Sequence, residues 1–316
     1  MTVSSGRYRD LNSFLRERFG CRVQKIPLDA GMTCPNRDGT KGTGGCIYCG
    51  GRGSGTGAYE STPDIRRQME LGMDWSSRRY KAKKFIAYFQ SFTNTYGPVD
   101  KLERLYRQAL ISEDVVGLSV GTRPDCVSDE TLNLLEDLAR KRMVWVEYGL
   151  QSSHDATLDI INRGHGFGDF VQAVERTSNR GILICAHLIL GLPGENRLHM
   201  LRTAERISQL QLDGLKLHLL YVLKNTPLED MYRRGEYRCL EMSEYADLVV
   251  DFLERMDPSL VIQRLTGDPN PLTDLVAPLW AADKRRTLDL IEQRFVERHT
   301  RQGKLFSDIR NTAKMM

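Results

Sequence analysis

Short apolar runs alternate with longer segments of helical periodicity along most of the chain. The runs are rich in Val, Ile, Leu and aromatic residues and lack strict alternation of apolar and polar positions. This pattern is typical of parallel strands that are covered on both faces. It predicts strands at 22–30, 84–90, 115–120, 143–150, 182–190 and 214–223.

The segments between these strands carry apolar residues at helical spacing. In 98–111, for example, Leu102 and Tyr106 fall on one helical face. Pro63 suits the first turn of a helix, and Gly181 suits a helix end. The predicted helices span 62–79, 98–111, 129–142, 156–162, 169–181, 197–212 and 243–257.

The series of strand-then-helix units predicts an α/β fold. Right-handed crossovers between consecutive parallel strands give a full or partial (β/α) barrel, and a doubly wound open sheet is the alternative. We expect the barrel to occupy residues 22–265. Residues 1–21 would form an N-terminal extension with a short amphipathic helix. Residues 266–316 would form a C-terminal extension with a basic helix at 284–304.

Composition adds two constraints. The 316 residues are 41% hydrophobic and 27% charged, as in ordinary soluble proteins, and the net charge of +4 permits an anionic partner such as RNA. The N-terminus lacks an apolar secretory segment, and the longest apolar stretch is too short to span a bilayer. We therefore expect a cytoplasmic protein with no membrane partner and with reduced thiols.

Three of the seven cysteines lie close together in a polar, glycine-rich loop. Cys34, Cys46 and Cys49 have the spacing C-x11-C-x2-C, whereas the other four are scattered. A zinc site needs four ligands, commonly two CxxC pairs, and the chain has one such pair. An iron–sulfur cluster with one open iron needs three thiolates. The spacing alone leaves an iron–sulfur site, a zinc site and unliganded thiols as alternatives.

Polar stretches follow the predicted strands, among them QSFTN, GTRPD, QSSHD and GLPGEN. Because parallel α/β folds place active sites at the carboxyl ends of their strands, these stretches should meet the cysteine loop at one mouth. The glycine-rich stretch at 50–57 lacks the G-x-x-x-x-G-K-[ST] form, which argues against nucleotide hydrolysis.

Taken together, these motifs resemble the radical S-adenosylmethionine (SAM) superfamily, in which three cysteines follow the first barrel strand and an aromatic residue precedes the third. Eleven residues separate Cys34 from Cys46, and a long gap is similar to the branch that contains the catalytic subunit of Elongator. GMTCPNRDGTKGTGGCIYC, YFQSFTNTYGPV and HLILGLPGE resemble the YhcC/YtqA family of that branch, over the chain to about Trp280. The resemblance implies a partial (β/α)6 TIM-type barrel of the radical SAM kind with short N- and C-terminal extensions.

The resemblance also implies a role for each matching residue. Cys34, Cys46 and Cys49 would bind a [4Fe–4S] cluster whose fourth iron is chelated by SAM. The residues expected to contact SAM are Tyr48, Gln90, Arg123, Glu147, Gln151, Arg163, His187 and Gly191. No residue of the chain is assigned as the catalytic acid or base.

Two positions depart from the family pattern. Gln90 lies where a Gly-Gly-Glu or Gly-Gly-Thr motif normally binds the SAM amino group. Near Arg123, Gly121 replaces the glutamate of Elongator-type chains. Glu147 in a salt bridge and His187 as a core histidine are the structural alternatives to SAM contacts. Tyr48 as a core aromatic is another.

The function implied by the resemblance is radical chemistry on tRNA. A reduced cluster would cleave SAM to a 5′-deoxyadenosyl radical, with electrons from a flavodoxin- or ferredoxin-type donor. The expected target is the aminomethyl- or carboxymethylaminomethyl-type side chain of the wobble uridine. The cations of the C-terminal segment could contact phosphates, although a solvated helix face is the alternative. They are Lys284, Arg285, Arg286, Arg294, Arg298, Arg301 and Lys304.

Three other functions compete with this one. A radical SAM enzyme could act on a small porphyrinogen-type molecule instead of tRNA. A methylthiotransferase would need a second three-cysteine cluster, which the four scattered cysteines do not supply. A non-enzymatic, zinc-stabilised RNA-binding module would bind zinc and would not cleave SAM.

Overall fold

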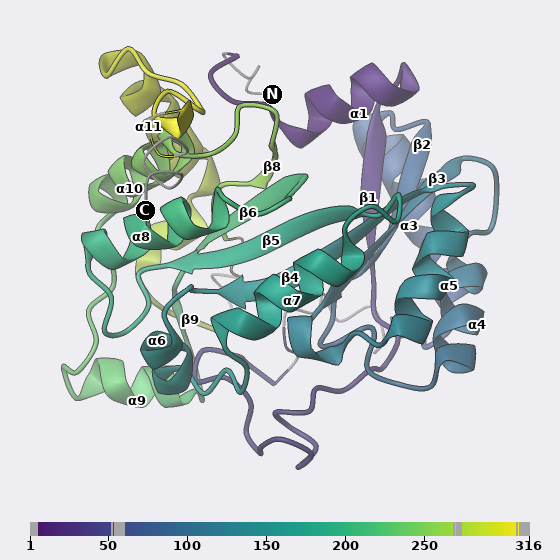
Figure 1. Ribbon diagram of the computed structural model, residues 1–316, viewed down its shortest axis with the longest axis horizontal. Coiled ribbons are helices and arrows are strands. Elements are labelled where there is room, and N and C mark those ends of the chain that lie inside the picture. The colour runs from purple at the N-terminus through teal and green to yellow at the C-terminus, as the bar shows by residue number, and fades with distance from the viewer. Residues whose placement is uncertain are drawn as a thin grey trace.

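The centre of the protein is a curved sheet of seven parallel strands, seen in the computed structural model in Figure 1. The structure describes residues 6–51, 53, 61–267, 269, 274–307 and 309. The strands are β1 (Val23–Leu28), β2 (Lys84–Phe89), β3 (Val115–Thr122), β4 (Met143–Gln151), β5 (Leu183–Leu190), β6 (Gly214–Leu219) and β8 (Val261–Arg264).

The strand order settles the choice between a barrel and a doubly wound sheet. Neighbours in the sheet follow the chain from β1 through β6 to β8, and every pair is parallel. A doubly wound sheet reverses its order at a switch point, and this sheet does not. The predicted partial barrel is confirmed. A seventh strand, β8, lies in the apolar stretch that follows the last predicted helix.

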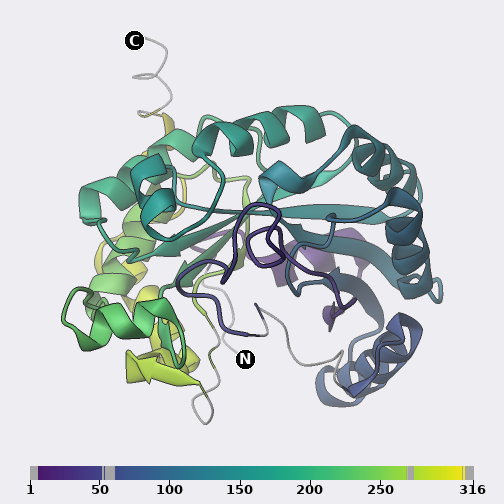
Figure 2. The same cartoon turned by 90° about the horizontal axis from the view of Figure 1, so that it is seen from below.

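Helices cover the outer, convex side of the sheet, and the cysteine loop lies on its concave side (Figure 2). This arrangement follows from right-handed crossovers between neighbouring parallel strands. The crossover helices are α3 (Ile65–Tyr80), α4 (Val99–Ala109), α5 (Asp129–Ala139), α6 (Asp155–Ile160), α7 (Phe167–Thr177), α8 (Arg197–Ile207) and α10 (Met242–Glu254).

Three local predictions are wrong. Pro63 precedes α3, because the side chain of Asp64 accepts the Arg67 N–H and caps that helix. Helix α7 ends at Thr177, so Gly181 lies in the following turn with φ +71° instead of ending the helix. The predicted strand 214–223 is broken after Leu219.

The break after β6 starts a small substructure that the periodicity did not predict. Strand β7 (Val222–Leu223) pairs antiparallel with β9 (Leu275–Ala277), and helix α9 (Pro227–Arg233) follows β7. Thr226 caps α9 and Pro227 occupies its first turn, which is a recognisable start signal. Parts of two predicted loops, 52 and 54–57, and 268 and 270–273, lie outside the described residues.

Both predicted extensions contain the expected helix. Helix α1 (Leu11–Phe19) covers the amino ends of the strands, where Phe14 meets Trp145 with ring centroids 6.1 Å apart. Helix α11 (Lys284–Glu297) packs against α10 and is shorter than the predicted 284–304. The mouth at the carboxyl ends of the strands is thus on the opposite side from α1. The domain boundaries at 21/22 and 265/266 stay a prediction.

Candidate functional site

The cysteine loop leaves β1 at the mouth and folds into a compact turn. The carbonyl of Cys34 accepts the N–H groups of Arg37 and Asp38, at 2.8 and 3.2 Å. Farther along, the Ile47 N–H donates to the carbonyl of Ile161 at 3.1 Å. The loop is therefore held by its own turn and by the segment that follows α6.

Asn36 fastens the loop to that segment. Its Nδ2 donates to the carbonyls of Asn162 and Arg163 at 2.7 and 2.9 Å, and Asn162 Nδ2 returns a bond to Gly45 O at 2.8 Å. A Cβ at Gly164, where φ is +68°, would lie 2.5 Å from Asn36 Oδ1. Glycine at 164 is thus required by both the backbone conformation and the close approach.

Arg163 brings a buried positive charge to the thiols. Its Nη1 lies 3.6 Å from Cys46 Sγ, and its Nη2 donates to the carbonyl of Gly149 at 2.7 Å. Burial opposes the charge, but Cys46 and Tyr48 raise the pKa of Arg163 above its usual range. The Nε atom is buried and has no hydrogen-bond partner among the described residues. An orphaned buried donor at this place suits an anionic ligand.

The three thiols of the cysteine loop are the candidate metal ligands of the mouth. Burial raises the pKa of Cys49, and the guanidinium of Arg37 opposes that rise. In the described part of the chain, no three His, Cys, Asp or Glu side chains gather around one metal position. Thiolates are the usual ligands of iron–sulfur clusters, and three of them leave one iron open to a further ligand. The donor set of Cys34, Cys46 and Cys49 fits the cluster.

Gln151 is held in an unusual backbone conformation beside Arg163. Its φ is +78°, in the left-handed region that non-glycine residues rarely adopt. A Cβ on Gly149 would lie 2.8 Å from both Gln151 Nε2 and Arg163 Nη2. The two side chains therefore converge over a glycine at the end of β4. Such strain is concentrated at functional sites in proteins, and two predicted SAM contacts meet here.

Arg123 is held by protein groups beside the cysteine loop. It forms two 2.9 Å bonds to Asp125 and donates to the carbonyl of Arg163 at 2.7 Å. Burial opposes the charge of Asp125, but Arg123 and Lys41 lower the pKa of that carboxyl well below its usual range. Arg123 thus braces the turn that carries Arg163, and its contact with SAM stays a prediction.

Glu147 lies lower in the barrel, where its carboxylate is completely buried. Oε1 accepts from Lys25 Nζ at 2.5 Å and from Ser119, while Oε2 contacts His187 Nε2 at 2.7 Å and Lys216 Nζ. Both oxygens therefore have protein partners. Glu147 thus forms the salt bridge that was its structural alternative, and its contact with SAM stays a prediction.

The charges of this interior network follow from burial and pairing. Burial opposes ionisation of Glu147, but Lys216 and Lys25 hold its pKa well below the usual value. Burial lowers the pKa of Lys216 to about 8, although Glu147 opposes the change. Burial, aided by Lys216, lowers the pKa of His187 to about 4, so this imidazole is neutral at pH 7. Neither Lys25 nor Lys216 was predicted as a site residue, although a lysine inside an apolar strand is a detectable signal.

The other predicted SAM contacts lie around the same mouth. Tyr48 is half-buried against the cluster of apolar residues that includes Leu158 and Ile189. Gln90 follows β2, and its N–H donates to the carbonyl of Leu28 at 3.2 Å. Gly191, with φ +87°, accepts the hydroxyl of Tyr237 at 2.9 Å. None of these contacts tests the predicted roles, which remain predictions.

Comparison with known proteins identifies the family. The profile of the Radical SAM superfamily matches residues 38–207, more than half of the chain, and that of the Radical SAM C-terminal domain matches residues 212–297. The chain belongs to the radical SAM superfamily. Enzymes of this superfamily use a [4Fe–4S] cluster and SAM, so the predictions of an enzyme and of these two cofactors are confirmed.

Individual relatives place this radical SAM enzyme near the Elongator branch. It is 41% identical to YtqA of Bacillus subtilis over 300 residues, covering 95% of this chain and 93% of that protein. It is 25% identical to a tRNA uridine(34) acetyltransferase of Methanocaldococcus jannaschii over 187 residues, 58% of this chain and 33% of that protein. The predicted family is confirmed.

A solved structure supports the fold. The archaeal Elp3 of Methanocaldococcus infernus superposes with a TM-score of 0.70 over 89% of this chain and 64% of that one, at 17% identity. This similarity confirms the barrel architecture of the radical SAM enzyme. Among the described residues, no helix combines the length and apolar character that crossing a membrane requires.

Proposed function

We propose that this radical SAM enzyme modifies the side chain of the wobble uridine of tRNA. The similarity to a tRNA uridine(34) acetyltransferase, over 58% of this chain, supports the choice of substrate. Aminomethyl- and carboxymethylaminomethyl-type uridines are the proposed targets. An external one-electron donor of the flavodoxin or ferredoxin type belongs to the same proposal.

The observation that carries the radical chemistry is the contact between the cysteine loop and Arg163. Cys34, Cys46 and Cys49 would hold the cluster, and Arg163 and Gln151 would contact SAM. The buried guanidinium 3.6 Å from Cys46 Sγ offers charge to an anionic cofactor, and its Nε has no partner in the described part of the chain. When bound, the cluster and SAM supply one-electron chemistry that removes a hydrogen atom from an unactivated carbon.

The protein's own residues would fix the geometry of this reaction. Asn36 ties the cysteine loop to the backbone of residues 162 and 163 and would thereby hold the thiols beside the guanidinium. Arg123 fixes the same turn from the other side. Deeper inside the barrel, Glu147 forms buried ion pairs with Lys25 and Lys216. Residues that are already held in place would position the reacting carbon of the substrate without rearranging during the reaction.

The proposal is tested by the nucleosides of cellular tRNA. We expect a strain without this gene to accumulate a precursor at the wobble uridine, measured by mass spectrometry of digested tRNA. A plasmid copy of the wild-type gene should restore the profile, whereas the Cys46→Ser variant should not. An unchanged wobble-uridine profile in the deletion strain would exclude tRNA as the substrate and favour a small molecule.

A further inference from the structure

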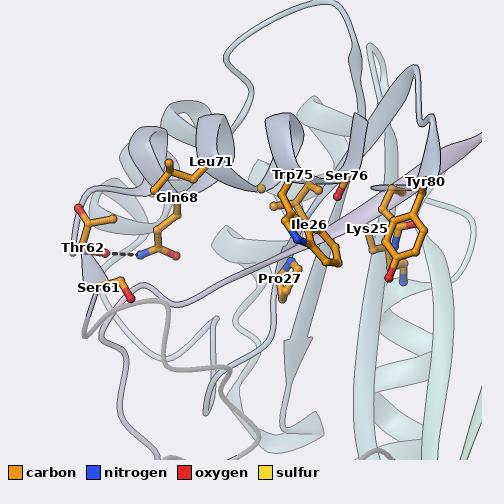
Figure 3. A pocket seen from close by; sticks show the side chains of 12 residues that line it. Lys25, Ile26, Pro27, Ser61, Thr62, Gln68, Leu71, Trp75, Ser76 and Tyr80 are labelled. Carbon is orange, nitrogen blue, oxygen red and sulfur yellow. Dashed lines mark hydrogen bonds between the residues drawn. The ribbon is translucent and has the colours of Figure 1, made fainter. Parts of the chain in front are cut away.

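A groove runs along the free edge of the half-barrel. Its volume is about 400 Å³, and it lies between β1 and helix α3, as Figure 3 shows. One end is lined by Ser61 and Thr62, and the other by Tyr80. Trp75 projects into it from α3 with 54% of its surface exposed. Large exposed aromatic side chains in a groove indicate a binding surface.

The sequence of β1 and α3 forms the groove. Gly72 lets α3 approach β1, because a Cβ there would lie 2.2 Å from Ile26 Cγ2. Pro27 lies at the unpaired edge of β1, where proline leaves no N–H group to attract another strand. Trp75 is supported edge-on by Tyr80 with ring centroids 5.1 Å apart. The groove thus has an aromatic wall formed by Trp75 and Tyr80.

The Tyr80 end of the groove carries a dense group of cations, which we call the basic end. Arg22 and Arg79 lie over the Tyr80 ring, with guanidinium carbons 5.1 and 5.7 Å from its centroid. Arg18 and Lys84 similarly lie over Phe19 at 5.9 and 5.5 Å. Lys81 and Lys83 complete the basic end and are exposed.

None of the six cations of the basic end is ion-paired with any described residue. Such a cluster is electrostatically unfavourable unless it faces solvent ions or an anionic partner. Arg18 and Arg79 are exposed and Arg22 is half-buried, so their guanidinium groups remain available to phosphate groups. The basic end therefore attracts a polyanion.

The C-terminal segment, for which phosphate contacts and a solvated helix face were the two alternatives, is different. Arg294 pairs with Asp247 at 3.0 Å and with Glu297 at 2.7 Å. Arg298 pairs with Asp251 and Glu254 at 2.8 and 3.0 Å. These two cations already have carboxylate partners, and Arg285 lies 3.7 Å from Asp289. The C-terminal segment is therefore the weaker candidate for an RNA surface.

We propose that the groove and the basic end bind a single-stranded segment of RNA that adjoins the base entering the mouth. This inference rests on the proposed function and adds the surface that holds the substrate. Proteins bind single-stranded nucleic acids with aromatic side chains that stack on the bases and with neighbouring cations that contact the phosphates. Strand β1 joins the basic end to the cysteine loop, and its six residues span about 20 Å.

The double variant Arg79→Ala/Lys83→Ala tests whether the basic end contacts RNA phosphates. The probe is an unmodified tRNA transcript with uridine at the wobble position, and the protein is the full chain with its cluster reconstituted anaerobically. We expect its dissociation constant to rise on the order of tenfold at 0.1 M salt. The slope of log K against log salt should fall by about 1.4, which corresponds to two lost phosphate contacts. The matched control, Arg285→Ala/Arg286→Ala, removes the same charge from α11 and should change neither quantity appreciably.

The variant Trp75→Ala tests whether an RNA base stacks on this side chain. The side chain is exposed, so its removal should leave the fold intact. We expect RNA binding to weaken about 5- to 150-fold with an unchanged salt slope, because stacking carries no charge. Trp75→Phe should retain most of the affinity. The readout is RNA binding, so it does not depend on turnover.

Two different outcomes separate this inference from the proposed function. If the wild-type enzyme changes the wobble nucleoside but the Arg79/Lys83 and Trp75 variants bind tRNA as tightly as wild type, the groove is not the RNA surface. If the wild-type protein neither binds tRNA nor alters it, the proposed function itself is wrong. Equal weakening by the α11 control would mean that total charge, and not this surface, governs binding.

Discussion

Replacing Glu147 with glutamine should destabilise the barrel strongly, because it removes the only carboxylate that the structure describes in contact with Lys25 and Lys216. Lys25 Nζ lies 2.5 Å from Glu147, and the two lysine side chains are 12% and 5% exposed. Glutamine keeps the shape but leaves two buried ammonium groups without a counter-charge. Breaking a buried pair in this way costs about 3–5 kcal/mol.

Thermal and urea unfolding measure this loss. With an unfolding entropy of about 2.1 cal/mol/K per residue, the chain of 316 residues should lose about 5 °C or more in Tm. The matched control is Glu103→Gln, which breaks an exposed pair with Arg107 and should cost less than about 1 kcal/mol. The double variant Glu147→Gln/Lys216→Met should recover part of the loss.

The pH dependence adds an independent test. Glu147 holds the pKa of Lys216 up, so the variant should lower that pKa below the value of about 8. A lysine whose folded-state pKa lies below its unfolded value near 10.4 binds fewer protons when folded, and stability therefore rises with pH between the two values. The stability of the variant begins to rise at a lower pH than that of wild type. The difference in unfolding free energy between the two proteins should therefore be smaller at pH 9 than at pH 7. A Glu147→Gln protein within about 1 kcal/mol of wild type at pH 7 would refute the ion-pair account.

Three further predictions concern the mouth and the interior. Burial lowers the pKa of His187 to about 4, so stability should fall by up to about 3 kcal/mol as pH drops from 6.5 towards 4. An NMR titration of this imidazole near pH 6.5 would contradict that prediction. Cys46→Ala should reduce the iron retained after anaerobic reconstitution to well below that of wild type, whereas removal of the buried thiol of Cys185 should not. Gly149→Ala places a methyl group 2.8 Å from Arg163 Nη2 and should slow SAM cleavage about tenfold or more with little change in Tm; normal cleavage would argue against the role of that guanidinium.

The long elements of the barrel could be predicted because their pattern is local. Apolar runs and helical spacing identify β2 to β5 and the helices between them, since burial on both faces leaves few polar positions. Strand β8 has four residues, and its apolar stretch was too short to identify as a strand. The break between Leu219 and Val222 was missed because the apolar run continues through it.

The site could be predicted only in part, because its geometry is long-range. The three cysteines were identifiable from spacing and resemblance. The hydrogen bond from Asn36 to the carbonyl of Asn162 links residues 126 positions apart, and no local pattern indicates such a contact. The pairing of Glu147 with Lys25 and Lys216 depends on the register of β1, β4 and β6, which the sequence does not reveal. The basic end was overlooked because α11 has a comparable number of cations, and only the structure distinguishes paired from unpaired ones.

The most direct measurement combines SAM cleavage with analysis of the tRNA product. The reconstituted enzyme is incubated anaerobically with SAM, a one-electron reductant and tRNA from the deletion strain, and 5′-deoxyadenosine and all tRNA nucleosides are quantified by mass spectrometry. We predict that tRNA stimulates formation of 5′-deoxyadenosine and that the change in mass is confined to the wobble uridine. Formation of 5′-deoxyadenosine with every tRNA nucleoside unchanged would contradict the assignment of tRNA as the substrate.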